Sequence, residues 1–287
     1  METNLLVMEY LKRLRLPTMA RELERCAAEA ADRGVSYPRF LLSLAELEVA
    51  QREDNTQRAR LACARFPVLK TLDGFDFSLT PGLPRQRLLH LAQGDFLDRA
   101  ENIIAIGTVG TGKTHLLIAI GVALCRIGKR VRFFTAAALV NAMQEAQAAH
   151  SLSKLEKFLD TFHLVIVDEF GYVPFGKAGA ELLFNFVANR YERKSIAISS
   201  NLDFSAWSRV LGEPQMTAAM VDRLTHRCQV LAMNFDSYRF RQSQMAAGLA
   251  GTGETTSDMC PAKSRRSKKS APVVADDACA QDEEETP

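Results

Sequence analysis

Residues 103–118 read IIAIGTVGTGKTHLLI, and this stretch decides the fold class of the chain. The apolar run 103–106 leads into the octet 107–114, which matches G-x-x-x-x-G-K-[ST] at every fixed position and precedes a second apolar run. Such an octet forms a loop between a buried strand and a helix, where main-chain N–H groups and the positive end of the helix bind phosphate. The stretch therefore predicts a strand, a phosphate-binding loop and a helix of a parallel α/β sheet.

The octet also assigns chemistry to single residues. Lys113 reaches the β and γ phosphates of a nucleotide, and the hydroxyl of Thr114 is a ligand for Mg²⁺. A chance match on a glycine-rich turn is the alternative, but with Gly usage of about 7% it is expected in only about 1% of chains of this length. The predicted nucleotide-binding residues are Gly107, Thr108, Val109, Gly110, Thr111, Gly112, Lys113, Thr114 and His115, with the His115 ring packed beside the loop.

Four further apolar runs indicate strands. They occupy residues 131–134, 164–167, 196–198 and 230–233, and longer helical patterns separate them. Runs without polar alternation are typical of strands buried on both faces. Together with 103–106 they predict a five-stranded parallel sheet with crossover helices, an α/β fold.

Two carboxylates follow the run 164–167. Asp168 is placed to hold Mg²⁺, and Glu169 can polarise the water that attacks a phosphoryl group. An apolar run that ends in Asp-Glu is also simply a strand that meets solvent, and taken alone that interpretation is the commoner one. Its position downstream of a phosphate loop favours the catalytic interpretation.

Two further polar residues lie near the last strands. Asn201 follows the run 196–198 and can either bond the γ-phosphate or start a turn, two interpretations of equal weight on chemistry alone. Arg223 lies in a helical pattern before the last run and can reach a neighbouring subunit's γ-phosphate as an arginine finger. Taken alone, an ordinary surface arginine is the commoner interpretation of Arg223.

The ends of the chain differ from this central region. Apolar residues recur at helical spacing from Leu5 to about residue 65, with Pro17 separating the first two helices, so residues 1–68 are predicted to form an all-helical module. Large apolar residues almost disappear after Met245, so 246–287 is predicted to be disordered. The α/β domain is then 69–245.

Composition excludes several classes of protein. The chain has 287 residues, is 47% hydrophobic and 24% charged, and carries 36 Lys+Arg against 34 Asp+Glu for a net charge of +2, so collagen-like and wholly disordered chains are excluded. A balanced charge argues against a nucleic-acid partner. However, residues 1–245 carry 31 basic and 26 acidic side chains, a net charge of +5, whereas 246–287 carry 5 and 8, a net charge of −3. The balanced total therefore does not argue against a nucleic-acid partner for residues 1–245.

Cysteine usage and the amino terminus bear on the compartment. The six cysteines form no C-x-x-C pair and no cluster with histidine, so we expect reduced thiols and no zinc site. The first residues lack a basic segment, and no apolar run is long enough to cross a bilayer. We therefore expect a cytoplasmic protein without a membrane partner.

The order of these motifs resembles the AAA+ ATPases, and the text between them resembles the IstB-like ATP-binding helper proteins of insertion-sequence transposases, relatives of the helicase loader DnaC. The resemblance covers about residues 1–245, and the usual proline after the first loop glycine is Thr108 here. The residues that carry it are Ala64-Arg65-Phe66-Pro67, Lys70-Thr71-Leu72, Phe75-Asp76-Phe77, 112–116, Asp168-Glu169-Phe170-Gly171-Tyr172, Asn189-Arg190-Tyr191-Glu192, Ser200-Asn201 and Asp222-Arg223-Leu224.

The resemblance implies an ATPase that uses ATP and Mg²⁺. It implies a sheet in which the strand of Asn201 lies between those of Lys113 and Asp168, which makes Asn201 a sensor of the γ-phosphate. It makes Arg223 the candidate finger and Arg239 a candidate second sensor. It further implies a head-to-tail homo-oligomer, a ring or a helix, that assembles on double-stranded DNA, stimulates its cognate transposase and is disassembled by ATP hydrolysis.

Three alternatives remain open from the sequence. A DnaC-like helicase loader would use the same ATPase on another client. A small-molecule kinase would also use a phosphate loop, but the Asp168-Glu169 pair, Arg223 and the lack of an Arg-rich lid argue against it. A DNA-binding scaffold that binds no nucleotide conflicts with the complete loop.

Overall fold

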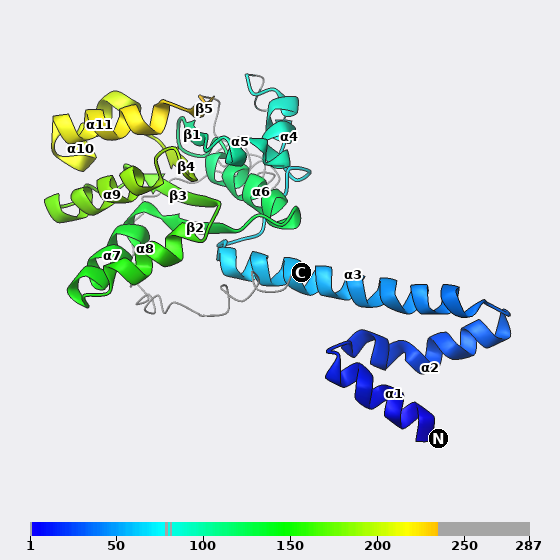
Figure 1. Ribbon diagram of the computed structural model, residues 1–287. Coiled ribbons are helices and arrows are strands. Elements are labelled where there is room, and N and C mark those ends of the chain that lie inside the picture. The colour runs from blue at the N-terminus through cyan, green and yellow to red at the C-terminus, as the bar shows by residue number, and fades with distance from the viewer. Residues whose placement is uncertain (1, 78–79, 81, 235–287) are drawn as a thin grey trace, which may run out of the picture. The chain divides into compact units, whose positions relative to one another are not determined.

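The computed structural model describes residues 2–77, 80 and 82–234 (Figure 1). Arg239 and the segment 246–287, for which the sequence made predictions, lie outside the described residues. The chain forms two compact units, of which the first ends at Ala59 and the second begins at Arg60.

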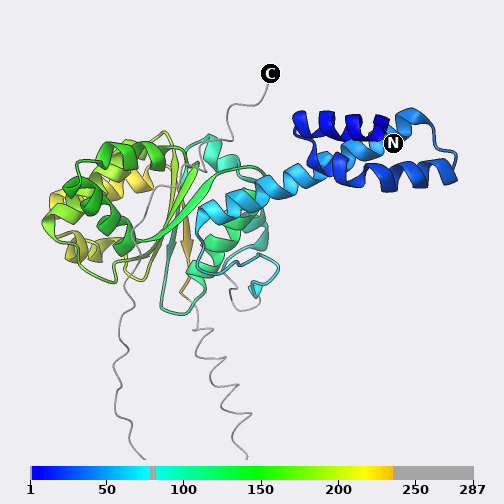
Figure 2. The same ribbon diagram turned by 90° about the horizontal axis from the view of Figure 1, so that it is seen from below.

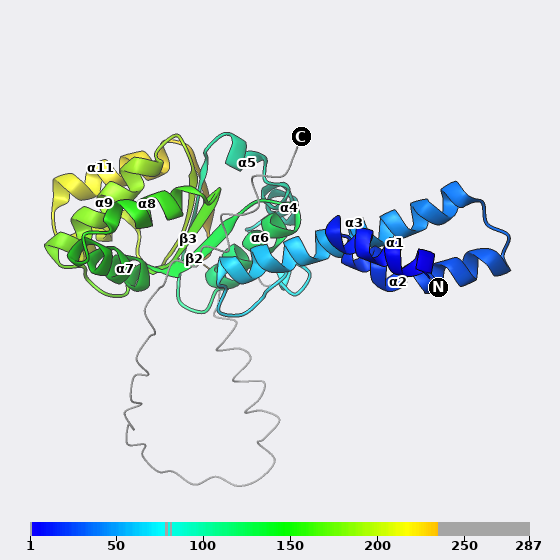
Figure 3. The same cartoon turned by 60° about the horizontal axis from the view of Figure 1, so that its bottom comes forward.

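The first unit is helical, which confirms the prediction for this region. It contains α1 (Glu2–Arg13), α2 (Pro17–Asp32) and most of α3 (Tyr37–Ala64), and these helices lie side by side (Figure 3). Pro17 is the first residue of α2, a position where its missing N–H leaves no hydrogen bond unmade. Met19, Cys26 and Leu44 are the buried centre of a small core.

A carboxylate from α3 caps the start of α2. Glu48 is 3% exposed, and its Oε2 accepts hydrogen bonds from the N–H groups of Thr18 (2.8 Å) and Met19 (2.9 Å). Helix N-termini leave such groups without intrahelical partners. Burial alone would raise the pKa of Glu48, but the hydrogen bonds from Met19, Arg52 and Thr18 outweigh it and hold the pKa below its ordinary value. Glu48 therefore stays charged and fixes α2 to α3.

The second unit contains a parallel sheet of five strands, as the sequence predicted, and the order of the strands is β2-β3-β4-β1-β5. The strand β4 lies between β1 and β3, as the resemblance implied. Strand β3 runs past the predicted end, so Asp168 and Glu169 lie within its last residues rather than beyond it. The strands are β1 (Asn102–Ile106), β2 (Val131–Thr135), β3 (Leu164–Phe170), β4 (Ser195–Ser200) and β5 (Cys228–Ala232).

Helices cover both faces of this sheet (Figures 1 and 2). One face carries α4 (Arg85–Gln93), α5 (Asp95–Asp98) and α6 (Lys113–Arg126). The other face carries α7 (Ala136–Ala148), α8 (Leu152–Asp160), α9 (Lys177–Arg190), α10 (Ser208–Leu211) and α11 (Pro214–Thr225).

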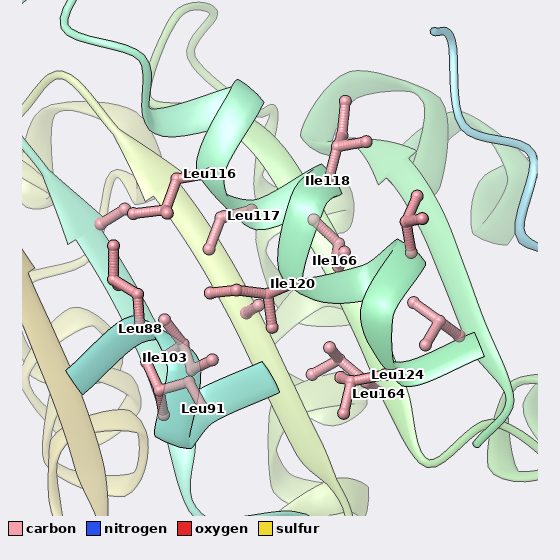
Figure 4. Packing of buried hydrophobic residues seen from close by; sticks show 14 of the residues in the cluster. Leu88, Leu91, Ile103, Leu116, Leu117, Ile118, Ile120, Leu124, Leu164 and Ile166 are labelled. Atoms are coloured by element: carbon pink, nitrogen blue, oxygen red, sulfur yellow. The ribbon is translucent and has the colours of Figure 1, made fainter. Parts of the chain in front are cut away.

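Side chains of β1 alternate between these two layers. Ile103 packs against the α6 layer and Ile104 against the layer of α7 and α9, as expected for a strand buried on both faces. Figure 4 shows Leu116 and Ile120 of α6 among the strand residues Ile103 and Ile166. This packing holds α6 against the sheet. Because α6 is the helix that follows the phosphate loop, the packing also fixes the end of the loop.

The buried Arg190 ties elements together at the amino ends of the strands. It is 3% exposed, and its guanidinium donates to the carbonyls of Leu159 (2.9 Å), Phe162 (2.9 Å) and Ser195 (3.1 Å). Burial lowers the pKa of Arg190 to about 10. This residue of the Asn189-Arg190-Tyr191-Glu192 block therefore joins the end of α8 to the starts of β3 and β4.

The cysteines Cys26, Cys125 and Cys228 are free thiols, and burial raises the pKa of Cys125 to about 12. In the part of the chain that the structure describes, no helix has the length and apolar character needed to span a membrane.

Candidate functional site

The phosphate loop lies at the carboxyl end of β1, between Ile106 and the first residue of α6. The N–H of Gly107 donates to Ser200 on β4 (3.2 Å), and the N–H of Met233, just after β5, donates to Ile106 (2.6 Å). A Cβ on Gly107 would lie 2.1 Å from the carbonyl oxygen of Met233, so only glycine fits here. Gly112 has a φ of 90°, in the left-handed region that favours glycine.

Lys113 is held against this loop. Its side chain is 6% exposed, and its Nζ donates to the carbonyls of Gly107 and Thr108, both at 2.7 Å. The hydroxyl of Thr111 donates to the same Thr108 carbonyl (2.9 Å). The Lys113 ammonium group, which is expected to bind the β and γ phosphates, therefore lies within the loop itself.

The two residues predicted to hold a metal lie in direct contact. The hydroxyl of Thr114 donates to Oδ1 of Asp168 (2.9 Å), and Asp168 is 4% exposed. Both side chains offer oxygen atoms, the ligands that Mg²⁺ prefers. Among residues 2–77, 80 and 82–234, no group of three or more His, Cys, Asp or Glu side chains is arranged to bind a metal. An ion at Thr114 and Asp168 would therefore need further ligands from phosphate and water.

Glu169 adopts a different environment from its neighbour. It is exposed and has a φ of 59°, which is uncommon for a residue with a side chain. Val167 pairs with Ile198 and Phe170 pairs with Ser200, so the ladder shifts register at the two carboxylates. At this irregularity the Asp168 side chain is buried and the Glu169 side chain is exposed.

Asn201 follows β4, directly beside the strands that end at the phosphate loop and at the carboxylates. Its side chain is half-buried, so it is accessible at the edge where the other site residues gather. The half-buried Arg223, on α11, does not join them. Its guanidinium lies 4.7 Å from the ring centre of Phe184 and donates to the carbonyl of Ala219 (3.2 Å).

The segment before the sheet contacts the loop from the other side. The Nε2 of His115 lies 3.2 Å from the carbonyl oxygen of Thr71, and the rings of His115 and Phe75 are 5.4 Å apart. A Cβ on Gly112 would lie 3.0 Å from the Phe75 ring. Burial lowers the pKa of His115, so its ring is neutral at pH 7. The expected packing of His115 beside the loop is confirmed.

One residue of the site escaped the sequence prediction. Ser199 donates a short hydrogen bond to Oδ1 of Asp168 and accepts one from the N–H of Glu169 (3.1 Å). The available signal was a serine inside an otherwise buried strand, since a buried hydroxyl needs a partner. The sequence does not say which residue that partner is.

Comparison with known proteins gives the family. The sequence profile described as IstB-like ATP binding protein matches residues 9–246. A protein of Geobacillus stearothermophilus named as an ATP-binding protein of insertion sequence IS5376 is 35% identical over 240 residues, which is 83% of this chain and 94% of that protein. An insertion-sequence ATP-binding protein of Sinorhizobium fredii is 40% identical over 235 residues, 82% of this chain and 78% of that protein.

Solved structures share the fold at low identity. A DNA replication initiation factor has a TM-score of 0.50 and 20% identity, covering 62% of this chain and 54% of that chain. AMPPCP-bound DnaA from Aquifex aeolicus has a TM-score of 0.50 and 19% identity, covering 63% of this chain and 55% of that chain. The chain thus spans about half the length of these two proteins, and the likeness shows the AAA+ fold alone. With its profile match and its relatives from insertion sequences, the chain belongs to the IstB-like ATP-binding protein family.

Proposed function

We propose that this chain is an ATP-hydrolysing transposition helper that assembles on duplex DNA, engages the transposase of its element and leaves the DNA when ATP is hydrolysed. Its family membership makes it an ATP-binding protein of the insertion-sequence type. The observation that best supports ATP hydrolysis is the hydrogen bond between Thr114 and Asp168 (2.9 Å) beside the phosphate loop. It shows that the end of the phosphate loop and the strand with the two carboxylates lie next to each other.

Thr114 and Asp168 would hold Mg²⁺. A magnesium ion usually takes one or two protein ligands and completes its octahedral shell with phosphate oxygens and water. When bound, it neutralises the charge of the phosphates during transfer. Lys113 would bind the phosphates of the nucleotide directly, because its ammonium group lies within the loop.

Glu169 would orient the water that attacks the γ-phosphoryl group and take its proton. Its carboxylate is exposed at the edge where Asp168 is buried, so one of the neighbouring carboxylates is available for water and the other for metal. Asn201 directly follows β4, the strand beside them, and would bond the γ-phosphate or the water.

Arg223 would act on the nucleotide of an adjacent subunit. Its packing on Phe184 keeps the guanidinium among the helices α9 and α11 rather than in the loop of its own chain. A contact between one subunit's finger and the next subunit's loop is heterologous, and such contacts build rings or helices. On the resemblance alone, Arg239 would be a second sensor of the bound nucleotide.

The domain assignment is part of the proposal. Residues 1–68 would form the module for oligomerisation or partner binding, 69–245 the ATPase and 246–287 a tail. Support for the module comes from apolar side chains that remain exposed, with exposed fractions of 71% for Leu5, 66% for Leu14 and 89% for Tyr37. Apolar surface of this kind is typical of contact sites.

Two further observations support the partners. The relatives are named for insertion sequences, whose own transposase is the natural client. Residues 1–245 carry a net charge of +5, which allows duplex DNA as a partner but offers few phosphate contacts per subunit. An oligomer would add these contacts together.

Glu169→Gln tests the proposal. The variant should bind MgATP like the wild type, hydrolyse it about 10²- to 10⁴-fold more slowly and stay longer on duplex DNA, because only the base is lost. Glu181→Gln, an exposed residue of α9, is the matched control and should behave like the wild type. Binding of nucleotide, steady-state hydrolysis and dissociation from duplex DNA are measured on the full chain. Normal turnover by Glu169→Gln would refute the assigned role.

The client is decided by capture with the full chain as bait. Recovery of the transposase supports the transposition helper, and recovery of a replicative helicase in its place would make the chain a helicase loader.

A further inference from the structure

The two carboxylates of the site face a single residue across the sheet. Between the pairs Val167 with Ile198 and Phe170 with Ser200, strand β3 has two residues and β4 has one. That one residue is Ser199. An extra residue in one strand bends it and turns side chains in new directions, and such bulges are frequent beside active sites.

The hydroxyl of Ser199 bonds to both residues of the bulge. It donates to Oδ1 of Asp168 and accepts from the N–H of Glu169 (3.1 Å). A serine hydroxyl has one proton to give and two lone pairs to accept with, so it can make both bonds at once. Ser199 is 3% exposed and Asp168 is 4% exposed, so no bulk water competes for them.

Each of the two hydrogen bonds restrains a different part of the bulge. Oδ1 of Asp168 also accepts from Thr114 (2.9 Å), so Ser199 and Thr114 together fix the plane of the carboxylate. Glu169 has a left-handed φ of 59°, a conformation that persists only when its surroundings hold it. The bond from its N–H to Ser199 is such a restraint.

We propose that Ser199 is a positioning residue that sets the metal-binding Asp168 and the catalytic Glu169 through one hydroxyl group. The inference rests on the proposed function, since it assigns Ser199 to the same reaction. Groups that orient a metal ligand from behind typically change metal affinity or activity by about 10- to 100-fold when removed. Ser199 would therefore affect the Mg²⁺ requirement and kcat, and leave the binding of nucleotide to the loop nearly unchanged.

Ser199→Ala and Ser195→Ala are the matched pair of variants. Ser195 also lies on β4 and is 0% exposed, but its hydroxyl has no hydrogen-bond partner among the residues that the structure describes. Both substitutions remove the same buried atom from the same strand. Ser195→Ala therefore controls for the loss of a buried hydroxyl from β4, because it breaks no hydrogen bond among the residues that the structure describes.

Three measurements on the full chain test the proposal. Ser199→Ala should keep the wild-type affinity for nucleotide without Mg²⁺, need about 10-fold or more Mg²⁺ for half-maximal binding of a non-hydrolysable ATP analogue, and lose about 10- to 100-fold in kcat. Hydrogen exchange without nucleotide should become faster in the peptide that contains Glu169. Ser195→Ala should match the wild type in all three.

Two results would overturn the assignment. One is a Ser199→Ala protein with wild-type Mg²⁺ dependence and unchanged exchange at Glu169; the other is an equal loss of affinity with and without Mg²⁺, which indicates a general structural defect. If the wild type binds nucleotide but does not hydrolyse it, the proposed function fails in its hydrolysis step. The Mg²⁺ dependence and the exchange then still decide the role of Ser199.

Discussion

At the scale of single residues, the phosphate loop depends on how closely two stretches of main chain approach each other. Gly107 has the carbonyl of Met233 directly where a side chain would start. The motif predicts glycine at this position for its approach to phosphate. The structure gives a second reason for glycine at this position, because the main chain just after β5 packs directly against the start of the loop.

Gly107→Ala should destabilise the protein and weaken nucleotide binding. A Cβ would lie 2.1 Å from the oxygen and 2.5 Å from the carbon of the Met233 carbonyl, and main-chain atoms cannot rotate away as a side chain does. Overpacking of this kind costs about 1–3 kcal/mol. Thermal unfolding and binding of MgATP are the measurements.

Gly176→Ala is the control for this substitution. Nothing lies within 4 Å of a Cβ at Gly176, and its φ of −62° suits alanine. Its melting temperature and MgATP affinity should stay close to the wild-type values. An equal effect of both substitutions would show that the Met233 contact does not matter.

Residues of the site differ in how far the sequence could predict them. Lys113 and Thr114 follow from a local pattern, because the loop and its helix are continuous in the chain. Ser199 does not, since its partners are 30 residues away or more and are known only when β3 and β4 pair with a bulge. The same reason hides the contact of His115 with Thr71, which depends on where the preceding segment folds back.

At the scale of elements, buried strands were predictable and their register was not. Five apolar runs identify β1 to β5 within a few residues. In β1 to β4 the reason is that a buried strand contains few polar residues, but β5 lies at the edge of the sheet and is only partly buried, so the expectation of burial on both faces is wrong for β5. The shift between β3 and β4 is set by pairing across the sheet, which the composition of either strand does not specify. Helix α2 was predictable from its periodicity, but its cap comes from Glu48 on another helix.

Glu48→Ala should lower the stability of the helical unit. Removal of the carboxylate leaves the first N–H groups of α2 without acceptors, a loss of about 1–3 kcal/mol. The folded-state pKa of Glu48 is lowered, so the stabilisation is present above the unfolded pKa of about 4.3 and is lost as the pH falls through the folded pKa. Hydrogen exchange of residues 17–32 at neutral and acidic pH measures both effects.

Glu46→Ala is the matched control, since Glu46 is an exposed residue of the same helix. It should leave exchange in α2 unchanged at either pH. If Glu46→Ala accelerates exchange in α2 as much as Glu48→Ala, the effect comes from α3 and the cap is not its cause.

At the scale of the whole molecule, the proposed assembly depends on residues from two subunits meeting at one nucleotide. The phosphate loop and both carboxylates lie at the carboxyl edge of one sheet, whereas Arg223 packs on Phe184 in the layer of α9 and α11. The family and the fold followed from the sequence, because the motifs keep their order along the chain. The assembly depends on surfaces between copies, which a single chain does not define.

An excess of the Arg223→Ala variant should inhibit ATP hydrolysis by the wild-type protein. Mixed oligomers contain intact loops that lack a finger from the neighbouring subunit, so ATP hydrolysis per wild-type chain should fall. Arg209→Ala, an exposed arginine on α10, is the control and should not inhibit. Hydrolysis and sedimentation of the mixtures are the readouts. Unchanged assembly and hydrolysis in the presence of excess Arg223→Ala would contradict a finger that acts between subunits.

The proposed ATPase activity is tested by the rate of ATP hydrolysis by the purified full chain, with and without duplex DNA and with no added metabolite. We predict that the wild type hydrolyses ATP, that duplex DNA raises the rate, and that Lys113→Ala neither binds nor hydrolyses ATP. A rate in Lys113→Ala equal to that of the wild type, or a wild type that hydrolyses no ATP on duplex DNA, would contradict an ATPase that works through this phosphate loop on DNA.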